Sequence, residues 1–188
     1  MALRRALLIT TSLLASTIFT MCSPGDDPED SKPSADRQPS SATATAYGST
    51  EAVNEYLTAI DPFIQRIGTI QAKVDEVLGS SGKGTGENLA PAASDARERL
   101  NQLFVEFDAV KPPSLLAPFH RDIKKLISLR LEAYAATVDG WELEQGGGDF
   151  RGNYDHAQSN YKEANEVIVG LNGEMAKILN AVQSAAGS

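Results

Sequence analysis

Cysteine and histidine are scarce in this sequence. Its 188 residues include one cysteine and two histidines. The single cysteine, Cys22, excludes a disulfide within the chain and any zinc site built from several cysteines. Neither His120 nor His156 has a glutamate three residues earlier, the spacing that di-iron carboxylate bundles use. A Cys-x-x-Cys-His motif for covalent haem is also absent. We therefore expect no metal site and no cofactor.

Basic residues and catalytic motifs are also few. Lysine and arginine number 17 against 25 acidic residues, and the formal net charge is −8. Nucleic-acid binding needs a concentrated basic face, so we expect no such partner. The sequence contains no Gly-x-Ser-x-Gly nucleophile motif, and its glycine-rich segment 82–86 lacks the Gly-Lys-Ser/Thr ending of a phosphate loop. We assign no catalytic residue and expect that the protein is not an enzyme.

The one long apolar run lies at the N-terminus. Residues 6–21 carry no charge and follow Arg4 and Arg5, a pattern typical of an export signal peptide. The run is shorter than the roughly 20 residues of a membrane-spanning helix, which disfavours the alternative of a retained anchor. General secretion is favoured over the twin-arginine route, because no Ser or Thr precedes the arginine pair. We expect residues 1–21 to be a signal peptide.

The apolar run ends in Phe19-Thr20-Met21-Cys22. This segment resembles the cleavage site of bacterial lipoprotein precursors, whose signal peptide is cut directly before a cysteine that then carries lipid. Thr20 matches the small residue usual two positions before that cysteine, whereas Phe19 and Met21 replace the usual Leu and the usual Gly or Ala. The resemblance implies a fatty acyl group such as palmitate on Cys22. It also implies a protein outside the cytoplasm, anchored to the cell membrane or the outer membrane.

The segment after Cys22 has the composition of a tether. Residues 23–49 are rich in Pro, Ser, Thr, Ala and Asp and contain no large aliphatic residue. Such a segment buries too little apolar surface to offset the entropy lost on folding. We expect residues 22–49 to be the lipidated cysteine and a disordered linker, with a root-mean-square span of about 29 Å.

Four later segments carry apolar residues at alternating steps of three and four, the period of a helix with one apolar stripe. They begin near residues 50, 89, 115 and 150 and end near residues 78, 110, 145 and 185. The first stripe continues through Pro62, which predicts one kinked helix. The last stripe has the coiled-coil period of about 3.5 residues. It consists of Phe150, Tyr154, Ala157, Tyr161, Ala164, Ile168, Leu171, Met175, Ile178, Val182 and Ala185.

The connections between these segments are short and rich in turn residues. They are the glycine-rich segment 79–86, the Lys-Pro-Pro-Ser segment 111–114 and the glycines 146–148. Short connections join antiparallel neighbours. The sequence therefore predicts an all-α fold, an antiparallel up-down-up-down four-helix bundle over residues 50–188. Because no segment alternates with a period of two, we expect no sheet.

His120 interrupts the third apolar stripe. In the predicted bundle, Tyr56, Phe104, Phe107 and Gly170–Gly173 of the other helices lie at the same level as His120. Glycine inside a helix costs about 1 kcal/mol relative to alanine, so glycines there suggest close approach or room for a guest. His120, Tyr56 and Phe107 are thus a candidate ligand site. The alternative is a buried histidine that is bonded to its neighbours, with the glycines only admitting bulky side chains.

Two surface features are also singled out. Lys111, Arg121, Lys124 and Lys125 gather at the end where the first helix begins; they either rest on anionic lipid headgroups or form a solvated charged face. At the other end, the aromatic residues around the glycine turn are expected to plug the core rather than to bind a ligand. They are Trp141, Phe150 and Tyr154.

These observations leave two candidate functions. The Pro-Pro turn and early helical histidine, within residues 111–141, also look like small bacterial lipoproteins with helical domains, a resemblance that implies no activity. The first function is a membrane-tethered interaction or scaffold module of the cell envelope, with another envelope protein as partner. The alternative is a small-ligand-binding or sensory bundle with its pocket near His120.

Overall fold

The computed structural model describes residues 44–80 and 86–187. This part of the chain is almost entirely helical, which confirms the all-α class. Its elements are β1 (Ala44–Thr45), β2 (Gly48–Ser49), α1 (Thr50–Ser80), α2 (Gly86–Asp108), a 3-10 turn (Ser114–Leu116), α3 (Ala117–Gln145) and α4 (Arg151–Ala186). The predicted signal peptide, Cys22 and most of the predicted linker lie outside the described residues.

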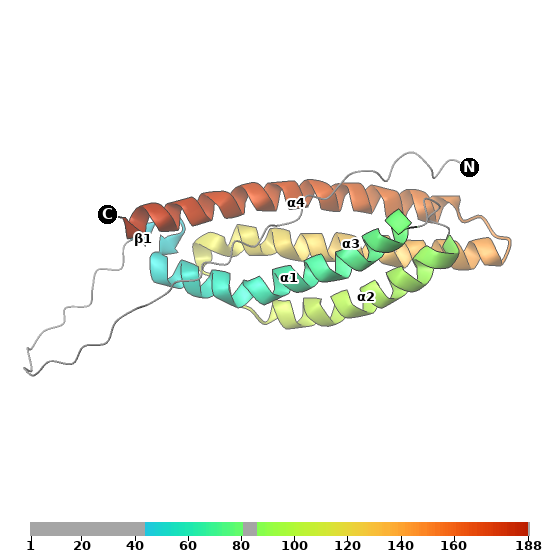
Figure 1. The fold of residues 1–188 in the computed structure, drawn as a ribbon, viewed down its shortest axis with the longest axis horizontal. Coiled ribbons are helices and arrows are strands. Elements are labelled where there is room, and N and C mark those ends of the chain that lie inside the picture. Colours follow the sequence, from blue (N-terminus) through green and yellow to red (C-terminus); the bar gives the residue numbers. More distant parts are fainter. Residues whose placement is uncertain (1–43, 81–85, 188) are drawn as a thin grey trace, which may run out of the picture.

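The four helices lie side by side along the long axis of the molecule (Figure 1). The small hairpin of β1 and β2 and the C-terminal end of α4 lie together at one end, and the turn between α3 and α4 lies at the other. α3 packs along both α2 and α4, whereas α1 packs mainly on α2 and touches α4 at few positions. α3 is therefore the central helix of the domain, and α1 is the least enclosed.

α1 begins at Thr50 and is one continuous helix, as the sequence predicts. The Ser49 hydroxyl accepts a hydrogen bond from the backbone N–H of Ala52 at 3.2 Å, and Glu51 lies in the first turn, where its charge favours the helix dipole. The helix passes through Pro62 without a break. Pro62 is exposed, so the carbonyl that loses its helical partner can bond to water.

The apolar stripes of α1, α2 and α4 face the core as predicted. Val53, Leu100 and Ile127 are fully buried, and Ile168 packs half-buried against them. None of the eleven stripe residues of α4 is exposed. α3 differs, since its buried residues also include Leu126, Arg130, Ala133 and Ala136. A helix enclosed by two neighbours buries more than one stripe, which explains why its apolar pattern is irregular.

The hairpin of residues 44–49 corrects two expectations, because this segment was assigned to the disordered linker and no sheet was expected. The Thr45 hydroxyl donates to the carbonyl oxygen of Gly48 at 2.9 Å, and Gly48 adopts a φ of 117° that favours glycine. Tyr47 packs against the core, and its hydroxyl donates to Glu174 of α4 at 2.9 Å. These contacts tie the start of the described chain to the last helix.

The glycine turn ends α3 as predicted. The N–H of Gly146 donates to the carbonyl of Glu142 at 3.0 Å, and that of Gly148 donates to Leu143 at 2.8 Å. Gly147 adopts a φ of 72° in the left-handed region, where a side chain would be strained. The chain therefore reverses within a few residues and starts α4.

Candidate functional site

His120, Tyr56 and Phe107 meet in one layer of the core, each from a different helix. The Nδ1 atom of His120 lies 3.1 Å from the hydroxyl oxygen of Tyr56. The imidazole stacks on the ring of Phe107, with 4.4 Å between centroids and 13° between planes. Phe63 closes the layer by an edge-on contact with Phe107 at 5.4 Å. The structure thus brings the three predicted residues into direct contact.

Side chains occupy the space around this histidine. His120 is only 8% exposed, and Tyr56 and Phe107 are buried as well. The expected glycines lie elsewhere: Gly170 and Gly173 are exposed, and a methyl group at either position would meet nothing within 4 Å. The prediction that they line the His120 layer is therefore wrong, because α4 turns them toward solvent. A ligand at His120 would have to displace the ring of Phe107.

The electrostatics of the layer favour neutral side chains. Burial lowers the pKa of His120 below its usual value, and the positive charge of Lys124 lowers it further, while Asp108 opposes the shift. Burial also raises the pKa of Tyr56 far above its usual value. Both groups are uncharged at pH 7, which suits a hydrogen bond inside an apolar core.

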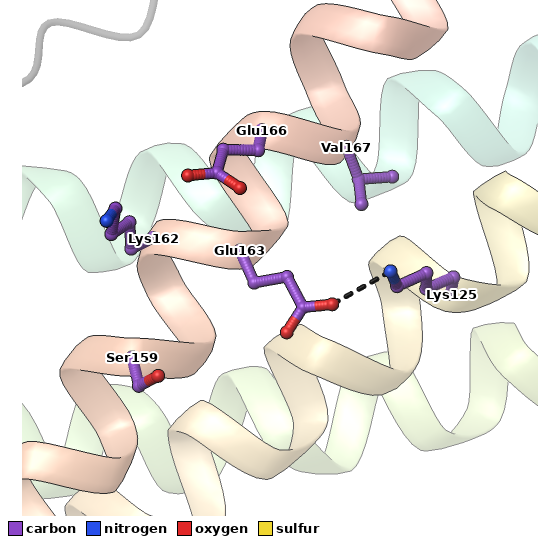
Figure 2. Close-up of a pocket in the computed structure, with 6 residues that line it drawn as sticks. All are labelled: Lys125, Ser159, Lys162, Glu163, Glu166 and Val167. Atoms are coloured by element: carbon purple, nitrogen blue, oxygen red, sulfur yellow. Dashed lines mark ion pairs between the residues drawn. The ribbon is translucent and has the colours of Figure 1, made fainter.

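The predicted basic patch is partly neutralised by ion pairs. Lys124 pairs with Asp108 and also lies over the ring of Phe104, 5.4 Å from its centroid. Lys125 pairs with Glu163 of α4 at 2.8 Å (Figure 2). Lys111 and Arg121 are exposed. Contact of this patch with lipid headgroups stays a prediction.

An open hollow of about 480 Å³ lies on the flank shared by α3 and α4. Figure 2 shows the side chains that line it. Its lining is mostly charged or polar and carries both signs. The residues are Lys125, Ser159, Lys162, Glu163, Glu166 and Val167. Exposed pairs of opposite charge contribute little binding energy, so this hollow has the character of an ordinary solvated face.

The aromatic residues at the glycine turn pack as the predicted plug. The rings of Phe150 and Tyr154 meet edge-on at 5.6 Å, and the Tyr154 hydroxyl donates to Glu144 at 2.8 Å. Trp141 and Tyr154 lie so close to Gly86 that a side chain at that position would overlap them. The first residue of α2 is thereby packed against the end of α3 and the start of α4.

A polar layer in the middle of the domain is the feature that sequence reasoning missed. Arg130 is only 3% exposed, and its Nη2 atom donates to Asn165 of α4 at 2.7 Å. Its guanidinium lies over the ring of Tyr161, 5.3 Å from the centroid. The hydroxyl of Tyr134 donates to Gln71 of α1 at 3.1 Å. The two tyrosines were predicted as apolar core, and no motif marks Arg130.

The described part of the chain holds no group of three or more His, Cys, Asp or Glu side chains placed to bind a metal ion. His156 is exposed, and its Nε2 atom lies 3.2 Å from the amide nitrogen of Asn160. Nor is any helix in residues 44–80 and 86–187 both long and apolar enough to cross a membrane.

The sequence matches no protein-family model, and no curated protein or solved structure matches it either.

Proposed function

We propose that this protein is an exported lipoprotein, held to a membrane of the cell envelope by lipid on Cys22. The support is the N-terminal sequence, in which Arg4 and Arg5, an uncharged apolar run and a cysteine follow in the order of a lipoprotein precursor. Residues 1–21 are then the signal peptide. Cys22 and the residues that follow it are then the lipidated anchor and the linker to the helical domain.

We propose the up-down-up-down four-helix bundle as the architecture of the tethered domain. Its support is the brevity of the connections between α2 and α3 and between α3 and α4. The pairwise packing of α1 with α2, α2 with α3, and α3 with α4 agrees with this order. α1 and α4 complete the bundle through a sparser contact.

The role that we propose for this domain is non-catalytic: it is an interaction or scaffold module for another envelope protein. The observation that carries this role is a strip of exposed apolar side chains on one face of α4, formed by Val169, Ala176 and Leu179. Val169 is 72% exposed and Leu179 is 43% exposed. Their spacing of seven and three residues aligns them along the helix. Aligned apolar side chains on a tethered domain suit the face of another protein.

The alternative function, binding of a small ligand near His120, has weaker support. His120, Tyr56 and Phe107 do converge, but their rings are in van der Waals contact and fill the layer. Thermal unfolding measured against a metabolite panel, with His120→Ala as control, addresses this function. A ligand that raises the melting temperature of the wild type but not of the variant would favour the sensory role.

Site-specific photo-crosslinking in intact cells tests the interaction role. A crosslinking side chain at Val169 is compared with one at Val105, a valine of α2 that is also 72% exposed. If α4 binds a partner, position 169 gives a discrete protein adduct and position 105 does not. Equal adducts at both positions, or none at either, would refute the assignment of the α4 strip.

A further inference from the structure

The face of α4 opposite the core carries a second series of residues at alternating steps of three and four. We call it the outer seam, and it consists of Glu166, Val169, Gly173, Ala176 and Asn180, all of which are exposed. Val169, its largest apolar residue, is 72% exposed. Figure 1 shows α4 along one side of the domain. The outer seam thus has the spacing of a helix-pairing face, and no helix among the described residues covers it.

A glycine occupies the centre of the outer seam. A methyl group at Gly173 would meet nothing within 4 Å, so no packing among the described residues accounts for a glycine there. Glycine inside a helix lowers stability relative to alanine. The distance between two packed helices depends on the side chains at their contact. A glycine on this face therefore suits the close approach of a second helix, with room for a larger side chain from that helix.

Two opposite charges lie on one edge of the outer seam. Glu166 and Lys177 are separated by about three turns of helix, so they share that edge. None of the ion pairs among the described residues includes Glu166, and its carboxylate points away from Lys125 in Figure 2. Lys177 pairs with Glu174 of its own helix, but its side chain is 69% exposed. Both charges are therefore accessible to another molecule.

We infer that two copies of this chain pair through their outer seams, with the two α4 helices antiparallel. Val169 of each copy then lies against Gly173 of the other copy, where no side chain takes up space. The same register places Glu166 beside Lys177 of the other copy, and the twofold symmetry forms this pair twice. A parallel pair would place Glu166 against Glu166 and Lys177 against Lys177. The charges therefore favour the antiparallel arrangement.

This inference rests on the proposed role of the α4 strip as a binding face, and it names a second copy of the chain as the protein bound. Exposed charge pairs add little to affinity, but they select the orientation and the partner of paired helices. A single face that complements itself in charge and in size is what a twofold interface requires. Packing of Val169 against the glycine supplies the apolar contact at its centre.

Photo-crosslinking in intact cells that express two copies of the full chain, each with a different epitope tag, tests the pairing. A crosslinking side chain at Val169 should give an adduct that carries both tags, whereas one at Val105 should not. An adduct of position 169 with another protein, and none with both tags, would overturn the inference but leave the proposed interaction role in place. The absence of any adduct at position 169 would overturn both.

Charge reversal tests the orientation. Glu166→Lys in both copies, or Lys177→Glu in both, brings like charges together at two places and should lower the yield of the two-tag adduct at least about fivefold. Glu166→Lys in one copy and Lys177→Glu in the other should restore the yield, because both pairs again have opposite charges. Glu98→Lys, the same change at an exposed glutamate of α2, should have no effect. Wild-type yields in the single reversals, or no recovery in the mixed pair, would refute the antiparallel arrangement.

A larger side chain at the central glycine tests the close approach. Gly173→Gln should leave the domain folded, because its Cβ atom meets nothing within 4 Å and glutamine has the better helix propensity. It should nevertheless abolish the two-tag adduct, since the new side chain occupies the place of Val169 of the other copy. Gly68→Gln makes the same change at an exposed glycine of α1 with equally open surroundings and should keep the adduct. An undiminished adduct in a folded Gly173→Gln protein would rule out this register.

Discussion

At the scale of single residues, two helix-interior glycines have opposite surroundings. A methyl group at Gly140 of α3 would lie 2.8 Å from a ring carbon of Tyr154 and 3.3 Å from the Cβ atom of Asn153. A methyl group at Gly170 of α4 would meet nothing within 4 Å. Close packing at the end of the core explains the first glycine. Nothing in the packing of the described residues requires the second.

Alanine substitution separates these two cases. Gly170→Ala should stabilise the domain by about 0.5–1 kcal/mol, because alanine has the better helix propensity. Gly140→Ala has the same propensity gain but should destabilise by about 1–3 kcal/mol, because Tyr154 is held in place by its contacts. Urea unfolding measures both free energies. Equal stabilisation by the two substitutions would show that the ring of Tyr154 moves aside freely.

His120 should make stability depend on pH. Its pKa in the folded state is lowered, chiefly by burial, so the unfolded chain takes up a proton first as the pH falls. The stabilisation is therefore complete above the unfolded pKa of about 6.5 and is lost as the pH falls toward the folded pKa. The slope is at most about 1.4 kcal/mol per pH unit.

Urea unfolding between pH 7 and pH 5 measures this slope as the free energy of unfolding at each pH. His120→Gln should flatten it, since glutamine does not titrate. His156→Gln changes the exposed histidine and should leave the slope unchanged. An identical slope in the wild type and in His120→Gln would contradict a buried, neutral His120.

At the scale of elements, the helices differ in how far the sequence determines them. α1, α2 and α4 each pack through one face, so a single apolar stripe locates them, even across Pro62. α3 is enclosed on two sides, and its buried Arg130 and Ala133 fit no single stripe. The strands of the hairpin span two residues each, too short for any periodic pattern. A contact between Tyr47 and a residue 127 positions later places the hairpin, and local sequence carries no sign of it.

The sequence also determines some features of the candidate sites and leaves others undetermined. Placement of His120 beside Tyr56 and Phe107 follows from the register of three stripes. The direction in which Gly170 and Gly173 face does not, because it depends on the rotation of α4 about its axis. Likewise, the partner of each hydroxyl in the polar layer depends on side chains from three helices, which no single segment specifies.

The hairpin should stabilise the start of α1. Tyr47→Ala removes both the ring contact with the core and the hydrogen bond to Glu174, so the first turns of α1 should open more often. Hydrogen exchange of the amides near Val53 should become at least about fivefold faster. Tyr47→Phe keeps the ring and should have a smaller effect. Unchanged exchange in Tyr47→Ala would show that the hairpin does not hold α1.

At the scale of the whole molecule, several features gather at one end of the domain. The described chain begins there, the hairpin packs on α4 there, and the C-terminal end of α4 lies beside it (Figure 1). α1 starts at this end as well. If Cys22 carries the proposed lipid, the chain that joins it to the hairpin would attach the long domain by its end. In this arrangement the exposed strip on α4 is free to meet a partner.

Membrane fractionation of cells that express the full chain tests the central claim most directly, because the proposed lipid anchor depends on one atom, the Cys22 sulfur. The wild type should sediment with the membranes. Cys22→Ser should move the protein to the soluble fraction, since serine does not accept the lipid. Equal membrane retention of the wild type and of Cys22→Ser would contradict a lipid anchor.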